Sequence, residues 1–204
     1  EVWSFYERPF DFDISEIIWD GSKFVAVGQY GREKFQEDTC PAGIIVSPDG
    51  LNWETLDVQF DIPWGLNHIA YNGNIYVVDD IADIYYSYDL KNWKKCDVFN
   101  GYNEGIEWVS DRFIATRGYN NILYSYDGIK WQSINQSWGN TMWACAYNGN
   151  VFVTVGFNGT IYVSYDGVNW ICKTEWHRID NDLLDVIWTG ERFVILGRQN
   201  NLTW

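Results

Sequence analysis

The chain alternates short apolar runs with tight polar turns at a regular spacing. One phrase, an aromatic residue followed by a turn and an apolar run, occurs five times: WDGSKFVAVG (19–28), YNGNIYVV (71–78), WVSDRFIATRG (108–118), YNGNVFVTVG (147–156) and WTGERFVILG (188–197). Asn-Gly or Asp-Gly between apolar runs is typical of a β-hairpin, because type I′ turns need positive φ. Each phrase therefore predicts two antiparallel strands.

A second phrase occurs in step with the first, as SPDGLNW (47–53), SYDLKNW (87–93), SYDGIKW (125–131) and SYDGVNW (164–170). Its aspartates are spaced by 40, 38 and 39 residues. The first unit is read as four strands: Ile14–Trp19, Phe24–Gly28, Ile44–Ser47 and Trp53–Val58. Four antiparallel strands in about 40 residues form the blade of a β-propeller.

The sequence therefore predicts an all-β fold, a five-bladed β-propeller of four-stranded antiparallel blades in a single domain over 1–204. The blades span about 14–58, 66–99, 105–135, 142–174, and 183–204 together with 2–6. NNLTW (200–204) resembles the start of a third strand, and VWSFY (2–6) resembles a fourth strand. We expect the N-terminal strand to close the last blade, since closure removes free sheet edges.

The second phrase resembles the Asp-box (BNR-type) repeat of sialidase-like propellers, although its copies are one residue shorter and Leu90 replaces glycine in the second. The resemblance implies a turn between the third and fourth strands with a structural role. Aspartate side chains bond the backbone amides of such turns, and glycine permits positive φ. The residues concerned are Ser47, Asp49, Trp53, Ser87, Asp89, Trp93, Ser125, Asp127, Trp131, Ser164, Asp166 and Trp170.

Composition and charge exclude several classes of partner. The formal net charge is −14 with only 14 basic residues, which argues against nucleic acid and anionic membranes. No apolar stretch approaches the ~20 residues that span a bilayer, so no membrane insertion is expected. No disulfide is predicted, because Cys96, Cys145 and Cys172 fall on separate strands and Cys40 on a long loop. No signal peptide is visible, and an extracellular or cell-surface setting is favoured.

Loops on one face of the predicted propeller carry aromatic and amide side chains. An aromatic ring beside amide groups suits a sugar, whose C–H face stacks while its hydroxyls need hydrogen-bond partners. An alternative of equal weight is that these rings do no more than cover the core. The long 28–43 loop could be a lid or a tolerated insertion. The candidate ligand-binding residues are Phe10, Trp64, Tyr102, Trp138, Trp176, Tyr30, Asn120, Asn158 and Asn200.

Polar residues also fall on the innermost strands, facing the predicted central tunnel. Glu16, His68 and Asp185 lie three positions before a hairpin aromatic, and Glu107 lies on a neighbouring inner strand. Carboxylates with a histidine could bind a divalent metal or shift each other's pKa. Solvated groups in a water-filled tunnel are preferred, because no ligand spacing is diagnostic. No metal or other cofactor is predicted.

The resemblance also suggests a second function, sialidase activity, which requires three arginines. Arg117 and Arg198 lie on the loop face, but the repeat supplies no third equivalent. Other glycoside hydrolases need two carboxylates about 5–10 Å apart, and no spacing singles out a pair. The predicted function is a non-catalytic, lectin-like carbohydrate-binding propeller, expected as a monomer with a glycan or polysaccharide partner. A protein-interaction scaffold is the alternative, and a small glycoside hydrolase comes third.

Overall fold

The structure, a computed structural model, describes residues 11–30, 41–58, 65–98, 101–118, 121–134, 140–174 and 181–199. These residues form four four-stranded antiparallel sheets and one two-stranded sheet. The first sheet contains β1 (Phe12–Trp19), β2 (Phe24–Tyr30), β3 (Ala42–Ser47) and β4 (Glu54–Thr55). The second contains β5 (His68–Tyr71), β6 (Tyr76–Asp79), β7 (Ile84–Ser87) and β8 (Lys94–Lys95).

The remaining sheets repeat this order. The third contains β9 (Asn103–Val109), β10 (Arg112–Arg117), β11 (Asn121–Ser125) and β12 (Gln132–Ser133). The fourth contains β13 (Met142–Tyr147), β14 (Phe152–Gly156), β15 (Ile161–Ser164) and β16 (Trp170–Cys172), with the 3-10 turn η2 (Phe157–Gly159) after β14. The fifth pairs β17 (Asn181–Trp188) with β18 (Phe193–Gln199). The strands predicted at 2–6 and 200–204 lie outside the described residues.

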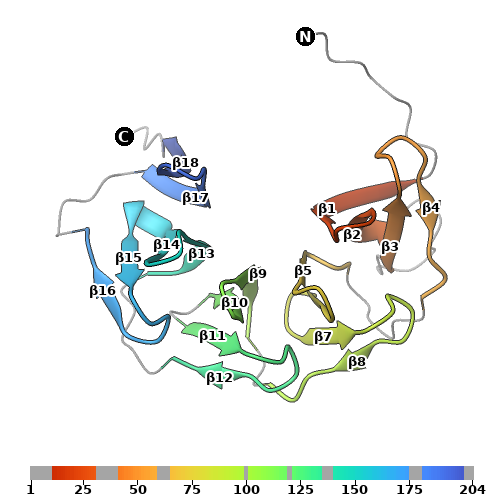
Figure 1. Ribbon diagram of the computed structural model, residues 1–204, viewed down its shortest axis with the longest axis horizontal. Helices are drawn as coiled ribbons and strands as arrows, with labels where there is room; N and C mark the ends of the chain where they lie inside the picture. Colours follow the sequence, from red (N-terminus) through yellow and green to blue (C-terminus); the bar gives the residue numbers. More distant parts are fainter. Residues whose placement is uncertain are drawn as a thin grey trace, which may run out of the picture.

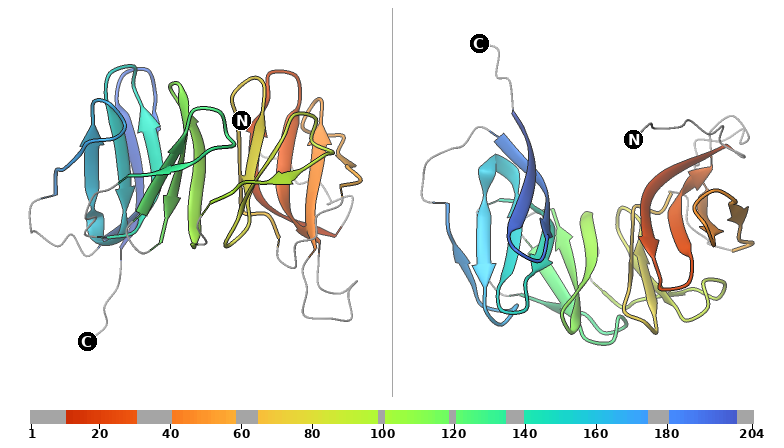
Figure 2. Two further views of the ribbon diagram at one scale, coloured as in Figure 1. Left: turned by 90° about the horizontal axis from the view of Figure 1, so that it is seen from below. Right: turned by 45° about the horizontal axis from the view of Figure 1, so that its top comes forward.

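The five sheets follow one another along an arc (Figure 1), with the first strand of each sheet innermost and, in the four-stranded sheets, the fourth strand outermost. The innermost strands contact each other in turn, β1 with β5, β5 with β9, β9 with β13 and β13 with β17. The first and fifth sheets lie at the two ends of the arc, and Figure 2 shows the sheets standing side by side. This arrangement places the polar residues of the first strands on the concave side.

Apolar side chains fill the junctions between neighbouring sheets. Between the first and second sheets, Val25 and Val27 pack with Ile69 and Val78, all of them buried. The other three junctions have comparable apolar clusters. Full burial of such a side chain stabilises the fold by about 1.5–3 kcal/mol. The alternating pattern of the hairpin phrases thus supplies each sheet with two apolar faces.

At the ends of the arc, the same repeat positions are exposed. Val194 and Leu196 of β18 occupy the positions of Val25 and Val27 in the phrase, yet they are 44% and 62% exposed. At the other end, Ile17 and Trp19 of β1 are 47% and 52% exposed. Each end of the arc therefore presents an apolar sheet face that, at the internal junctions, packs on a neighbouring sheet.

Side-chain hydrogen bonds fix the turns of the second phrase. Asp166 Oδ1 accepts the N–H groups of Val168 (2.9 Å) and Asn169 (2.7 Å), and the buried Ser164 Oγ accepts the N–H of Gly167 (2.8 Å). Hydrogen bonds from Asn169 and the turn amides hold the pKa of Asp166 well below its usual range. The carboxylate bonds recur at Asp49, Asp89 and Asp127.

Two details of these turns differ from the sequence prediction. The fourth strand of the first unit is only Glu54–Thr55, because Trp53 belongs to the turn and donates its indole N–H to the Gly50 carbonyl (3.0 Å). Leu90 adopts the left-handed φ of 64° that the other copies give to glycine. Its side chain is 3% exposed and packs in the junction between the first two sheets, which compensates for the backbone conformation.

Candidate functional site

The predicted loop site is only partly within the described residues. Phe10, Trp64, Trp138, Trp176, Asn120 and Asn200 lie outside them. Tyr102 is 54% exposed, as a ligand platform requires. Tyr30 packs edge-on against Phe12, with ring centroids 5.2 Å apart. Asn158 adopts a left-handed turn conformation, and its N–H donates to Asp182 Oδ1 (3.2 Å), so its position serves the local fold.

The arginines considered for a sialidase site are engaged within the fold. Arg117 is 2% exposed and donates from Nε to Asn103 Oδ1 (2.7 Å). Arg198 forms an ion pair with Asp182 (3.1 Å).

Backbone irregularities position the acidic residues of the concave side. The register of β1 shifts between Ile14 and Glu16, and that of β17 shifts between Leu183 and Asp185. Such β-bulges redirect the side chain that follows them. Glu16 and Asp185 therefore occupy equivalent positions on the innermost strands of the first and last sheets. The hydrophobic pattern alone does not reveal these bulges.

Two glutamates connect their strands to the next sheet of the arc. Glu16 Oε2 accepts the N–H of Ile69 (2.7 Å), which joins β1 to β5. Glu107 Oε1 accepts the N–H of Cys145 (2.9 Å), which joins β9 to β13. Each carboxylate thus uses one oxygen to satisfy a backbone donor of a neighbouring sheet.

Burial raises the pKa of both carboxyl groups well above the ordinary value for glutamate. It raises the pKa of Glu16 to about 7, despite the N–H of Ile69, and the negative charges of Asp79 and Asp185 raise it further. Burial likewise raises the pKa of Glu107 to about 8, with further contributions from Asp185 and Glu16. The four residues predicted as a tunnel cluster, Glu16, His68, Glu107 and Asp185, therefore lie within electrostatic reach of one another.

His68 is paired with a buried aspartate. The His68 N–H donates to Asp79 Oδ1 (2.9 Å), and its ring Nδ1 lies 3.0 Å from the same oxygen. Burial opposes protonation of the ring, but the hydrogen bond and charge of Asp79 raise the pKa of His68 above its ordinary value. The pair orients the imidazole beside the glutamates.

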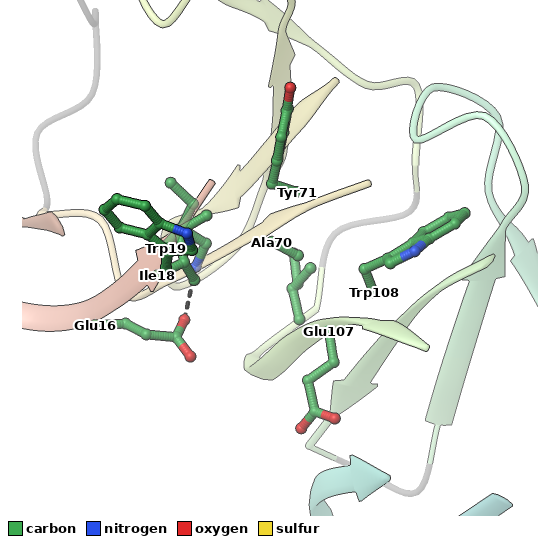
Figure 3. Close-up of a pocket in the computed structure, with 9 residues that line it drawn as sticks. Glu16, Ile18, Trp19, Ala70, Tyr71, Glu107 and Trp108 are labelled. Carbon is green, nitrogen blue, oxygen red and sulfur yellow. Dashed lines mark hydrogen bonds between the residues drawn. The ribbon is translucent and has the colours of Figure 1, made fainter. Parts of the chain in front are cut away.

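A pocket of about 300 Å³ lies on the concave side, formed by β1, β5 and β9. Glu16, Ile18 and Trp19 come from β1, and Glu107 and Trp108 come from β9. Figure 3 shows Trp19 and Trp108 on opposite sides of the pocket, Tyr71 of β5 between them, and the two carboxylates at the other end. Ile69, Ala70 and Ile106 complete the lining.

Sequence reasoning identified the two glutamates but missed the three aromatic residues. Trp19, Tyr71 and Trp108 were assigned only to hairpin turns, although each directly precedes the turn on an innermost strand. That shared position is the signal that could have found them. In the part of the chain that the structure describes, no group of three or more His, Cys, Asp or Glu residues could hold a metal ion.

A scan against protein-family models found no match, and no curated protein matches the chain. Several solved structures are similar in fold. "YCF48 bound to D1 peptide" has a TM-score of 0.67 at 15% identity, over 92% of this chain and 61% of that one. The WD40 β-propeller domain of Doa1 has a TM-score of 0.65 at 14% identity, over 92% and 63%.

The extracellular domain of the putative hybrid two-component system BT4673 from B. thetaiotaomicron gives a TM-score of 0.65 at 12% identity, over 94% of this chain and 26% of that one. These similarities show a β-propeller fold. The chain spans about three fifths of the length of the YCF48 and Doa1 structures. Within the described residues, no helix has the length and apolar character to cross a membrane.

Proposed function

We propose that this propeller is a non-catalytic protein-interaction scaffold whose concave side binds a basic peptide segment. The observation that carries the proposal is the gathering of Glu16, Glu107 and Asp185 around the concave side, next to a pocket of peptide side-chain size. Above about pH 8, where the carboxyl groups of Glu16 and Glu107 are ionised, a basic partner would be attracted to this side, and the net charge of −14 would speed the encounter.

The fold comparisons support a protein or peptide partner better than a glycan. One similar propeller, YCF48, is described as bound to a D1 peptide. The similarity is one of fold, so the identity of that peptide does not transfer. We propose for this chain only the general mode of binding, in which a propeller surface holds an extended peptide.

A basic decapeptide of alternating lysine and glycine, labelled with a fluorophore, tests the proposal by polarisation. At about pH 9, where both glutamates are ionised and lysine is still cationic, we expect binding at about 50 mM salt that weakens strongly at about 500 mM, and no binding of the matching glutamate peptide. The double variant Glu16→Gln/Glu107→Gln should weaken binding by about fivefold or more. The control Glu54→Gln/Glu191→Gln removes the same charge from exposed positions. Equal loss in both variants would mean general surface attraction and would contradict the proposal.

Carbohydrate binding on the loop face remains a second candidate, favoured by the exposure of Tyr102. A glycan array with wild-type protein and the Tyr102→Ala variant tests it. A glycan signal that the variant loses would support a lectin-like site. Turnover of an aryl glycoside, abolished by a carboxylate substitution, would instead support the third reading, a small glycoside hydrolase.

We further propose that the propeller is of the Asp-box type and has five blades, the last one completed by residues 2–6. The exposed apolar faces at the two ends of the arc support closure, because equivalent faces pack together at every internal junction. A chain lacking residues 1–8 should then melt at a clearly lower temperature. An unchanged melting temperature would contradict closure by the N-terminal strand.

A further inference from the structure

The carboxyl groups of Glu16 and Glu107 belong to one cavity although they come from different sheets. Both residues line the pocket between β1, β5 and β9, and Figure 3 shows their carboxyl groups at the same end of it. One oxygen of each group accepts a backbone N–H of a neighbouring sheet, that of Ile69 for Glu16 (2.7 Å) and that of Cys145 for Glu107 (2.9 Å). These bonds fix both carboxyl groups on the concave side of the arc.

Other charged and titratable groups reach this pair from several strands. Among the described residues, the groups within electrostatic reach of one or both glutamates are His68 of β5, Asp79 of β6, Cys145 of β13 and Asp185 of β17. Glu104 of β9 acts in turn on His68 and Asp79. All of these groups except the imidazole of His68 are acids, and His68 is paired with Asp79 at 3.0 Å. A cation among them is therefore stabilised by each proton that the site loses.

Near neutral pH the two glutamates hold protons that a cation can displace. Burial raises the pKa of Glu16 to about 7 and the pKa of Glu107 to about 8, and the nearby acids contribute to both shifts. At about pH 7 the two groups together therefore hold about 1.4 protons. A bound ammonium group favours the ionised carboxylates and so lowers both pKa values. Protons thus leave the site as the cation enters it.

We infer that the concave side takes up a cationic peptide in exchange for protons, and that Glu16 and Glu107 are the groups that release them. The inference deepens the proposed function and rests on it, because it concerns the same basic peptide. It adds a regulation by pH: the peptide binds weakly while both glutamates are protonated and tightly once both are ionised. By linkage, the number of protons released equals the slope of the logarithm of the affinity against pH.

Isothermal titration calorimetry of the full chain with the basic decapeptide measures this exchange. Titrations at about pH 7 in phosphate and in HEPES, two buffers of different ionisation enthalpy, give the number of protons released. We expect about 0.5–1 proton from the two glutamates at this pH, and almost none at about pH 9, where both are already ionised. If the peptide lowers each pKa by about one, its affinity rises by about 50-fold between about pH 6 and about pH 9.

Matched variants assign the released protons. Glu16→Gln/Glu107→Gln keeps an oxygen acceptor for both N–H groups, and it should abolish most of the release and flatten the dependence of affinity on pH. The control Glu54→Gln/Glu191→Gln removes two exposed carboxylates and should leave the release unchanged. His68→Gln removes the imidazole and should keep most of the release. Circular dichroism checks that each variant is folded, and the pH profile of the wild-type affinity is a test that needs no variant.

Two results would overturn the inference and leave the proposed function standing. The first is peptide binding at about pH 9 with no proton release at about pH 7 and an affinity that does not change with pH. The second is a release that persists in Glu16→Gln/Glu107→Gln and disappears in His68→Gln, since the imidazole would then be its source. Absence of peptide binding at every pH would instead contradict the proposed function, and the inference would fall with it.

Discussion

The carboxyl group of Glu107 should make the protein less stable at alkaline pH, and replacing it by glutamine should remove this effect. Glu107 is partly buried, and its Oε1 accepts the N–H of Cys145 at 2.9 Å. Glutamine has nearly the same shape, and its amide oxygen can accept the same hydrogen bond. The Glu107→Gln variant therefore removes a charge while preserving the contact between β9 and β13.

The expected magnitude follows from the pKa of Glu107, which burial raises from 4.5 to about 8. A carboxyl whose pKa is higher in the folded chain holds its proton more tightly when folded. The contribution of Glu107 to the free energy of unfolding is therefore most favourable below about pH 4.5 and is lost as the pH rises through about 8. At about 1.4 kcal/mol per tenfold change in proton affinity, the loss is at most about 5 kcal/mol. Because the side chain is partly exposed, we expect about 2–3 kcal/mol.

Urea unfolding at about pH 5 and about pH 9 measures the free energy of unfolding of both proteins. At the lower pH the protonated wild-type side chain resembles glutamine, so the two should agree within about 1 kcal/mol. At the higher pH the variant should be more stable by the amount given above. The exposed Glu191→Gln variant keeps Glu107, so its free energy of unfolding should match that of the wild type at both pH values. A Glu107→Gln variant that gains nothing at the higher pH would refute the reasoning.

Three further substitutions test other parts of the structure by thermal or urea melting. Ser164→Ala leaves the turn N–H of Gly167 without its buried acceptor and should cost about 1–3 kcal/mol; no loss would mean that water replaces the hydroxyl. Gly128→Ala adds a methyl group 2.9 Å from Val77 Cγ2 at a φ of 74°, so it should destabilise by about 1–3 kcal/mol. Gly149→Ala also has a positive φ, of 94°, but its methyl group meets nothing within 4 Å, so its loss of stability measures backbone strain without a clash. Leu196→Gln should change stability by less than about 0.5 kcal/mol if the end face is exposed, and a loss of about 2 kcal/mol or more would support closure of the ring.

The repeat in the sequence predicted much of the fold correctly. The hairpin phrases identified β1 and β2, because apolar alternation and the Asp-Gly turn at Asp20 and Gly21 act locally. The short fourth strands and the β-bulges were not predicted. A bulge depends on how one extra residue is accommodated between two strands, and hydrophobic periodicity does not encode this.

The candidate site was predicted less completely. Position in the repeat identified Glu16 and Glu107 as residues of the inner strands, since that depends only on period. Their association with Trp19 and Trp108 depends on how closely three neighbouring sheets approach, which is a property of the arc's curvature. Ligand-binding aromatic and amide residues were predicted on the opposite loops, where only Tyr102, Tyr30 and Asn158 fall within the described residues.

The stacking of sheets along an arc has a consequence for how the protein unfolds. Among the described residues, each internal sheet packs against two neighbours, whereas β17 and β18 of the fifth sheet pack on the fourth sheet alone. In such a nearly one-dimensional array, stability is close to a sum of unit and nearest-neighbour terms. Amide hydrogen exchange should then be fastest in the terminal sheets and slowest in β9 and β10 at the centre. If the arc stays open, the molecule loses structure from its ends inward, and the three sheets that form the pocket lose their order one after another. A ring closed by residues 2–6 would instead remove this difference in exchange between terminal and central sheets.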